Sequence, residues 1–352
     1  MIRFSSLWFL LLVFTLSPVS AQVNGDSALT LSHEGVVTSA AWSPDGAQIL
    51  TTSEDATANI WNSGNGERVM TLAHSSPVRG GRWNTDGTRI LTWEENGTVS
   101  IWDVTTGESM MQTTHQANVL GAMWSRDETS VLSWSSDATA QLWEVESGQT
   151  ANLPHQSPVL EAMWNADESL IYTFEESGRA HIWTVNDALN AEETRVLNFG
   201  DTALGAIWND DGTRILSWGA DGGVQLWDAE TRLIVRTLDH NSFIDGARWN
   251  RDETRILSWS GDDSARIWNA ADGEELMRFR HQDWVTDALW NRDESRVLTT
   301  SYNAAYLWNA VSGELLGTFD HENLVNGAAF NPDETRILSW SWDGTARVWE
   351  VG

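Results

Sequence analysis

Residues 250–268, with the sequence NRDETRILSWSGDDSARIW, contain the local signals that decide the fold. The segment NRDET is rich in residues that favour tight turns, and it leads into a β-prone run over residues 255–260. A second turn follows at Asp262 and Asp263, and the β-prone pattern resumes over residues 265–268. Short runs of this kind, separated by tight turns, predict neighbouring antiparallel strands.

The same pattern recurs along the whole chain with a period of about 41 residues. It ends on a tryptophan in all eight copies, at Trp61, Trp102, Trp143, Trp183, Trp227, Trp268, Trp308 and Trp349. A second aromatic column lies upstream of the first, at Trp42, Trp83, Trp124, Trp164, Trp208, Trp249, Trp290 and Phe330. A third column precedes it, at His33, His74, His115, His155, Phe199, His240, His281 and His321. This periodicity predicts one structural unit that is repeated eight times.

The length and the turns of each unit indicate about four short strands. The turn before the second strand holds an aspartate in every copy, where a short acceptor can bond a backbone amide two residues on. A period of about 40 residues with four strands predicts an all-β fold, a single eight-bladed β-propeller of four-stranded antiparallel blades over residues 22–352. Because the chain ends just after Trp349, we expect the strand at residues 28–32 to pair with the last blade and close the ring.

These columns resemble the WD-repeat family. The likeness rests on the upstream histidine, on the aspartate six residues before the third-strand tryptophan, and on that tryptophan itself. The resemblance implies that a serine on the second strand joins these three residues in a buried, structural hydrogen-bond set. The implied sets are His33, Ser53, Asp55 and Trp61; His115, Ser135, Asp137 and Trp143; His240, Ser260, Asp262 and Trp268; and His321, Ser341, Asp343 and Trp349.

The chain has 23 tryptophans, and most of them repeat with the period, which indicates packing between blades rather than ligand binding. Besides the two columns above, five tryptophans lie on the second strands, at Trp93, Trp134, Trp218, Trp259 and Trp340. The family usually has a small residue at that position, so these five depart from its pattern.

Residues 1–21 have the layout of a secretory signal peptide: one cation at Arg3, an apolar run over residues 7–16, and a small-residue exit at residues 19–21. We expect cleavage before Gln22, no membrane insertion afterwards, and an extracytoplasmic location, either periplasmic or secreted. The chain has no cysteine, which excludes disulfides and cysteine-ligated metals. Its net charge of -29 argues against nucleic acid and anionic membranes as partners.

No catalytic constellation stands out in the sequence, and we expect no enzymatic activity, no cofactor and no metal. The chain lacks a Gly-rich phosphate loop and a His-Glu-x-x-His motif. The pairs Glu94-Glu95 and Glu175-Glu176 could perform acid–base chemistry or bind calcium, but neighbouring residues on a strand point to opposite faces. A hydrolase that uses channel carboxylates on first strands, such as Glu161 or Asp287, is a third functional hypothesis.

The resemblance also implies where ligands dock, namely the end of the ring with the loops before the first strands and the turns between second and third strands. An aromatic arc is predicted there on blades six to eight, formed by Phe243, Trp284, Tyr302 and Trp342. Charged positions fall mostly on the other blades, at Glu54, Arg79, Glu95 and Glu176. Exposed aromatic side chains are common anchors for proteins and for sugar rings.

The main hypothesis is therefore a monomeric, non-catalytic scaffold that binds a protein partner on this end of the ring. The negative charge makes a basic protein one candidate partner. The alternative is a carbohydrate-binding propeller that uses the aromatic arc.

Overall fold

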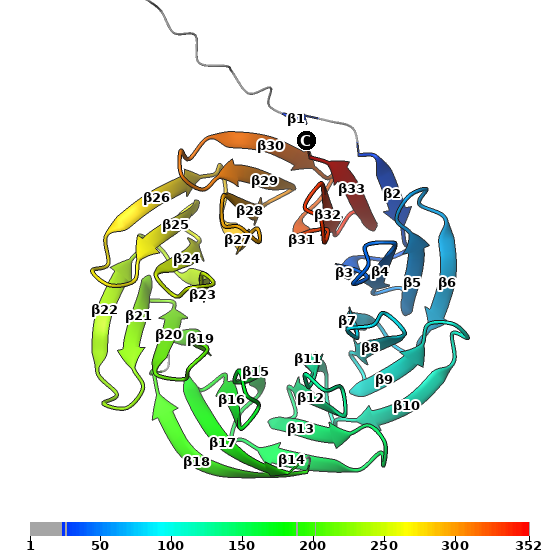
Figure 1. Ribbon diagram of the computed structural model, residues 1–352, viewed down its shortest axis with the longest axis horizontal. Helices are drawn as coiled ribbons and strands as arrows, with labels where there is room; N and C mark the ends of the chain where they lie inside the picture. The colour runs from blue at the N-terminus through cyan, green and yellow to red at the C-terminus, as the bar shows by residue number, and fades with distance from the viewer. Residues whose placement is uncertain (1–22, 25–26, 188, 201, 352) are drawn as a thin grey trace, which may run out of the picture.

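The computed structural model of the protein describes residues 23–24, 27–187, 189–200 and 202–351. The described residues form strands and no helix, and the strands build eight sheets arranged as a ring (Figure 1). The prediction of an eight-bladed, all-β propeller is confirmed. The signal peptide predicted at residues 1–21 lies outside the described residues and stays a prediction. Within the described ranges, no helix has the length and apolar character needed to cross a membrane.

Each blade runs from an innermost first strand to an outermost fourth strand, and neighbouring strands within it are antiparallel (Figure 1). Blade one contains β3 (Val37–Trp42), β4 (Gln48–Ser53), β5 (Thr57–Asn62) and β6 (Arg68–Ala73). Blade two contains β7 (Val78–Trp83), β8 (Arg89–Glu94), β9 (Thr98–Asp103) and β10 (Ser109–Thr114). Blade three contains β11 (Val119–Trp124), β12 (Ser130–Ser135), β13 (Thr139–Glu144) and β14 (Thr150–Pro154). Blade four contains β15 (Val159–Trp164), β16 (Leu170–Glu175), β17 (Arg179–Asp187) and β18 (Asn190–Asn198).

The second half of the ring repeats this arrangement. Blade five contains β19 (Ala203–Trp208), β20 (Arg214–Gly219), β21 (Gly223–Asp228) and β22 (Ile234–Asp239). Blade six contains β23 (Ile244–Trp249), β24 (Arg255–Ser260), β25 (Ser264–Asn269) and β26 (Glu275–Arg280). Blade seven contains β27 (Val285–Trp290), β28 (Arg296–Ser301), β29 (Ala304–Asn309) and β30 (Leu315–Asp320). Blade eight contains β31 (Val325–Phe330), β32 (Arg336–Ser341), β33 (Thr345–Glu350) and the N-terminal strand β2 (Leu29–Ser32).

Strand β2 closes the ring by pairing antiparallel with β33, as the sequence predicts. The pairing joins Leu29 to Val348 and Ser32 to Thr345, so the last blade obtains its fourth strand from the other end of the chain. A feature that the sequence did not indicate is β1 (Val23–Asn24), which pairs in parallel with β30 and adds a fifth strand to blade seven.

The aspartate turns form as expected. In blade one, Asp45 accepts a hydrogen bond from the backbone N–H of Ala47, at 3.0 Å, and the other seven blades repeat this bond. In five blades the residue after the aspartate is a glutamate in the left-handed backbone region, such as Glu294 with φ 60°. Its carboxylate reaches the preceding blade, where it accepts from the side chain of Asn250 at 2.8 Å and the N–H of Arg251 at 2.7 Å. Each such glutamate therefore fastens two blades together.

The five second-strand tryptophans lie over glycines of the first strand. Gly246 pairs with Trp259, and an added Cβ at residue 246 would lie 2.1 Å from Cζ2 of that ring. The same pairing occurs between Gly80 and Trp93, Gly121 and Trp134, Gly205 and Trp218, and Gly327 and Trp340. In the three blades without this tryptophan, the first-strand residue is Ser39, Glu161 or Asp287. The tryptophan thus fills the space that the glycine leaves, a cross-strand packing that stabilises a glycine in a sheet.

The hydrophobic core lies between neighbouring blades. One buried cluster joins Leu216 and Leu226 of blade five to Ile244, Ile256 and Trp268 of blade six. The rigid frame that results positions the loops and turns at each end of the ring.

Candidate functional site

The histidine, aspartate and tryptophan columns meet inside the blades. In blade one, Nδ1 of His33 lies 3.0 Å from a carboxylate oxygen of Asp55, and Nε2 lies 2.7 Å from the hydroxyl of Thr51. The indole N–H of Trp61 donates to the same hydroxyl at 2.7 Å. Because the hydroxyl accepts from the indole, its own proton is available to Nε2, and Nδ1–H donates to Asp55. Burial lowers the pKa of His33 although Asp55 opposes this effect, which favours the neutral ring.

The structure corrects the serine of this set. The hydroxyl that bridges histidine and tryptophan belongs to Thr51 in blade one, two residues before the expected Ser53. Ser53 instead accepts the backbone N–H of Asp55 at 3.1 Å, within the turn. The same correction applies to Ser135, Ser260 and Ser341, because Ser133, Ser258 and Ser339 contact His115, His240 and His321. The indole N–H of Trp268 and Trp349 reaches the bridging serine, whereas that of Trp143 has no partner among the described residues.

The two glutamate pairs also have structural partners. The turn residue in blade two is Asn96 instead of aspartate, and the buried carboxylate of Glu94 accepts from the N–H of Ser75 at 3.2 Å. In the blades that have the turn aspartate beside the column histidine, this aspartate accepts the N–H of the residue after the histidine, as Asp55 does from Glu34 at 3.0 Å. Glu175 has the same role in blade four, accepting from the N–H of Gln156 at 2.9 Å. These carboxylates thus replace the missing aspartates. In the part of the chain that the structure describes, no group of three or more acidic or histidine residues could hold a metal ion.

The loops before the first strands and the turns between second and third strands lie at the same end of each blade. Together they form the upper face of the ring. A backbone hydrogen bond joins the two in seven blades, for example from the N–H of Glu54 to the carbonyl of Val36 at 3.0 Å, and from Trp342 to Leu324 at 2.8 Å. In these seven blades the loop and the turn are therefore held side by side.

The predicted aromatic arc lies on the upper face of blades six to eight. Trp284, Tyr302 and Trp342 are exposed by 42%, 55% and 51%, which is unusual for such large apolar side chains. Phe243 is half-buried, and its ring packs edge-on against Trp284 with centroids 5.7 Å apart. Tyr302 has a φ of 48°, a left-handed conformation that costs a bulky residue free energy.

Hydrogen bonds connect this arc to the neighbouring blade. The indole N–H of Trp342 donates to the side-chain oxygen of Asn326 at 2.6 Å. The amide of Asn326 donates in turn to the carbonyl of Val37 in blade one at 2.8 Å. Asn326 therefore holds one edge of the arc in place, a role that the sequence did not reveal.

The charged residues separate into two groups. Arg79 binds both Glu54 and Glu95, with N–O distances of 2.9 and 2.7 Å, so the acids of blades one and two share one cation. Glu176 is exposed on blade four, apart from that pair. Three leucines, Leu120, Leu160 and Leu204, are exposed on the first strands of blades three to five. Exposed apolar side chains thus also occur on blades outside the aromatic arc.

The first strands also carry the acids of the hydrolase hypothesis. Asp287 is paired with Arg248 at 2.9 Å, which holds its carboxylate in an ion pair. Burial raises the pKa of Glu161 to about 7, against the attraction of Arg248. Glu161 and Asp287 belong to blades four and seven, and Arg248 of blade six acts on both carboxylates.

The comparisons with known proteins agree with this architecture. The family model "WD domain, G-beta repeat" (WD40) matches residues 25–62, 66–103 and 313–350. No curated protein matches the chain. Among solved structures, the crystal structure of the computationally designed Ika8 protein is similar, with 21% identity and a TM-score of 0.81 over 93% of this chain and 100% of that one. At that identity the likeness concerns the fold alone. Three segments of the chain therefore match the WD40 repeat, and the described residues fold as an eight-bladed β-propeller.

Proposed function

We propose that the protein is a non-catalytic scaffold that binds a protein partner through the upper face of the ring. WD40 propellers commonly act in this way, and fold alone does not determine function, so the proposal rests on the site. The observation that carries it is the aromatic arc: Trp284, Tyr302 and Trp342 are each exposed by more than 40%, on neighbouring blades. Large apolar side chains grouped at the surface mark interaction sites, and tryptophan and tyrosine dominate the binding energy of protein interfaces.

The location and the chemistry of the partner are part of the proposal. The signal-peptide layout of residues 1–21 supports an extracytoplasmic protein, either periplasmic or secreted. The net charge of -29 favours a partner with a basic surface, since opposite potentials speed association. We propose that the propeller itself is monomeric.

The test compares the mature protein with Trp284→Ala/Trp342→Ala as baits in the native extracytoplasmic fraction, followed by titration of the captured partner. The matched control is Met110→Ala/Val311→Ala, which removes two exposed apolar side chains away from the upper face, 54% and 78% exposed. The aromatic variant should bind at least about thirtyfold more weakly, the effect of losing one strong interface residue, and the control should bind like the wild type.

Equal affinity for the wild type and the aromatic variant would contradict the proposal. Binding to immobilised glycans, with no protein captured, would favour the carbohydrate-binding alternative instead. Thermal melting of each variant shows whether the propeller remains folded.

A further inference from the structure

The junction between blades four and five departs from the repeat at three positions that meet in space. Phe199 occupies the histidine position. In five other blades, the turn after the third strand holds a glycine whose backbone is in the left-handed region, with φ between 70° and 80°. Blade five has Arg232 at this position, with φ 61°. Three other junctions pack a methionine against that glycine, as Met70 does against Gly107, whereas this junction has Arg195.

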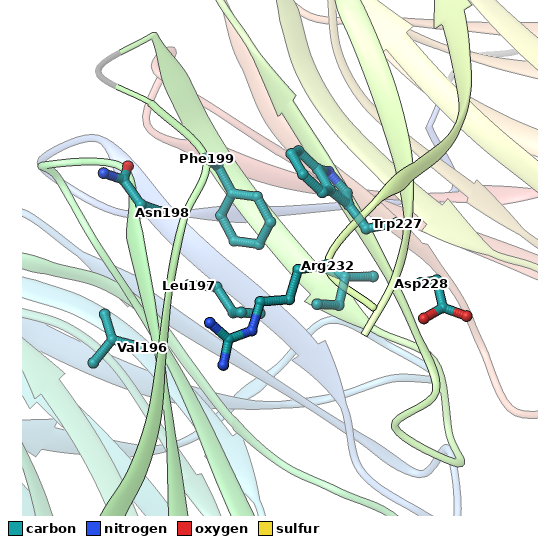
Figure 2. Close-up of a pocket in the computed structure, with 8 residues that line it drawn as sticks. Val196, Leu197, Asn198, Phe199, Trp227, Asp228 and Arg232 are labelled. Atoms are coloured by element: carbon teal, nitrogen blue, oxygen red, sulfur yellow. The ribbon is translucent and has the colours of Figure 1, made fainter. Parts of the chain in front are cut away.

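At this junction a pocket lies between the outer strand β18 of blade four and blade five, and Phe199 and Arg232 are among its lining residues (Figure 2). Its volume is about 240 Å³, and its apolar lining includes Val196, Leu197, Phe199 and Trp227. The third-strand tryptophans of the other seven blades are buried, but Trp227 is only partly buried. Part of the indole that is covered everywhere else is therefore accessible here.

The methionine that packs against the turn glycine at three other junctions has no counterpart at the junction of blades four and five. Arg195 turns to the carbonyl of Ala229, to which its guanidinium donates at 3.0 Å. Phe199 packs against Trp227 with ring centroids 5.2 Å apart, so one aromatic wall is held in place. A concave, mostly apolar pocket with aromatic walls and a few polar groups is the usual form of a small-molecule site, and this one has room for a small ligand.

One unpaired cation faces this pocket. The guanidinium of Arg232 lies beside Val196 and Leu197 in Figure 2, and the described residues supply no side-chain acceptor for it. The carboxylate of Asp228 points away from it and accepts instead from the N–H and hydroxyl of Thr231, both at 2.7 Å. An arginine in a left-handed conformation that glycine occupies elsewhere is strained, and strain of this kind concentrates at functional sites.

We propose that this pocket binds a small aromatic monocarboxylate, with its ring packed against the wall that Phe199 and Trp227 form together and its carboxylate on Arg232. Aromatic rings pack favourably against both walls, and a guanidinium pairs with a carboxylate through charge-assisted hydrogen bonds. The pocket lies on the rim between two blades, so the inference does not depend on the aromatic arc of the upper face.

The test measures binding of phenylacetate and 3-phenylpropionate by calorimetry and ligand-observed NMR, beside the neutral phenylacetamide and the cationic phenethylamine. The acids should bind about tenfold more tightly than the amide, the ordinary effect of one charge-assisted hydrogen bond, and the amine should not bind. Arg232→Gly should weaken binding of the acids about tenfold and leave the amide unchanged. This variant should fold, because it restores the residue that five other blades carry at this position.

Arg195→Met, which restores the filler of other junctions, should weaken the acids and the amide alike. Arg236→Met, the equivalent change at the next junction, should change neither. Absence of saturable binding of both acids up to about 10 mM would overturn the inference, as would equal affinity for acid and amide or acid binding that survives Arg232→Gly.

Discussion

Replacing Gly246 by alanine tests how the second-strand tryptophans are packed. An alanine Cβ at this position would lie 2.1 Å from Cζ2, 2.5 Å from Cε2 and 2.8 Å from Cη2 of Trp259. The ring is 7% exposed, and the guanidinium of Arg248 lies 4.9 Å from its centroid. The indole is therefore almost completely covered, and with an alanine at residue 246 it must move or the strands must separate.

Whether Gly246→Ala raises or lowers the free energy of unfolding decides between two opposing effects. In an ordinary strand, glycine to alanine stabilises a protein by about 0.5–1 kcal/mol, because the unfolded chain loses freedom. Overpacking a tight core costs about 1–3 kcal/mol. We therefore expect Gly246→Ala to lower the free energy of unfolding by about 1 kcal/mol, the difference between the middle values of these two effects. Equilibrium urea denaturation followed by circular dichroism measures it.

Two comparisons isolate the contact. Gly64→Ala, where the nearest atom to the new Cβ is the flexible side-chain oxygen of Asn62 at 3.3 Å, should change stability by less than about 0.5 kcal/mol. In a Trp259→Thr background, Gly246→Ala should no longer destabilise, because blade one tolerates Ser39 opposite Thr52. If Gly246→Ala stabilises the wild-type protein, the packing argument is wrong.

Three further predictions concern the rest of the fold. Burial lowers the pKa of His74, His155, His240 and His281 to about 4. Their contribution to stability should therefore be complete above pH 6.5, the ordinary histidine pKa, and be lost as the pH falls toward 4, with a slope of up to about 1.4 kcal/mol per pH unit for each. Urea midpoints that are equal at pH 7 and pH 5 would contradict this prediction. Glu294→Gly should destabilise the protein by about 1 kcal/mol, because the lost bonds to Asn250 and Arg251 outweigh the relief of left-handed strain, and a rise in melting temperature would show the reverse. The melting temperature should rise between dilute buffer and molar salt, since screening reduces the self-repulsion of a net charge of -29, and an unchanged value would reject this.

The fold could be predicted because each blade repeats the same local chemistry. The turn aspartates bond backbone amides two residues on, an interaction that depends on a few consecutive residues. Ring closure followed from the position of Trp349 near the chain end and a strand-like segment before the first blade. Short-range signals repeated eight times suffice for such inferences. The pairing of β1 with β30 depends on how one edge strand meets a distant segment, and the sequence contains no comparable signal for it.

The two packing details that sequence analysis missed had a signal in the columns. The bridging position, Thr51 in blade one, carries a hydroxyl residue in all eight copies, whereas the position of Ser53 also holds glutamate and glycine. Residues two apart on a strand share a face, so alternation alone could not separate these two positions. Likewise, glycine occurs on the first strand in the five blades that have a second-strand tryptophan, which is a covariation between strands.

Departures from the repeat are the best guide to function in this chain, but their meaning depends on the contacts between blades. Trp284 and Trp342 lie outside the structural columns, and the structure exposes both. Phe199 and Arg232 also break their columns, yet nothing in the sequence shows that they share a pocket. They meet because the outer strand of one blade lies against the third strand of the next, an arrangement set by packing rather than by chain order. Residues that depart from the repeat and that the fold brings together thus identify a candidate site. An isolated departure such as Asn96 is instead compensated within its own blade by Glu94.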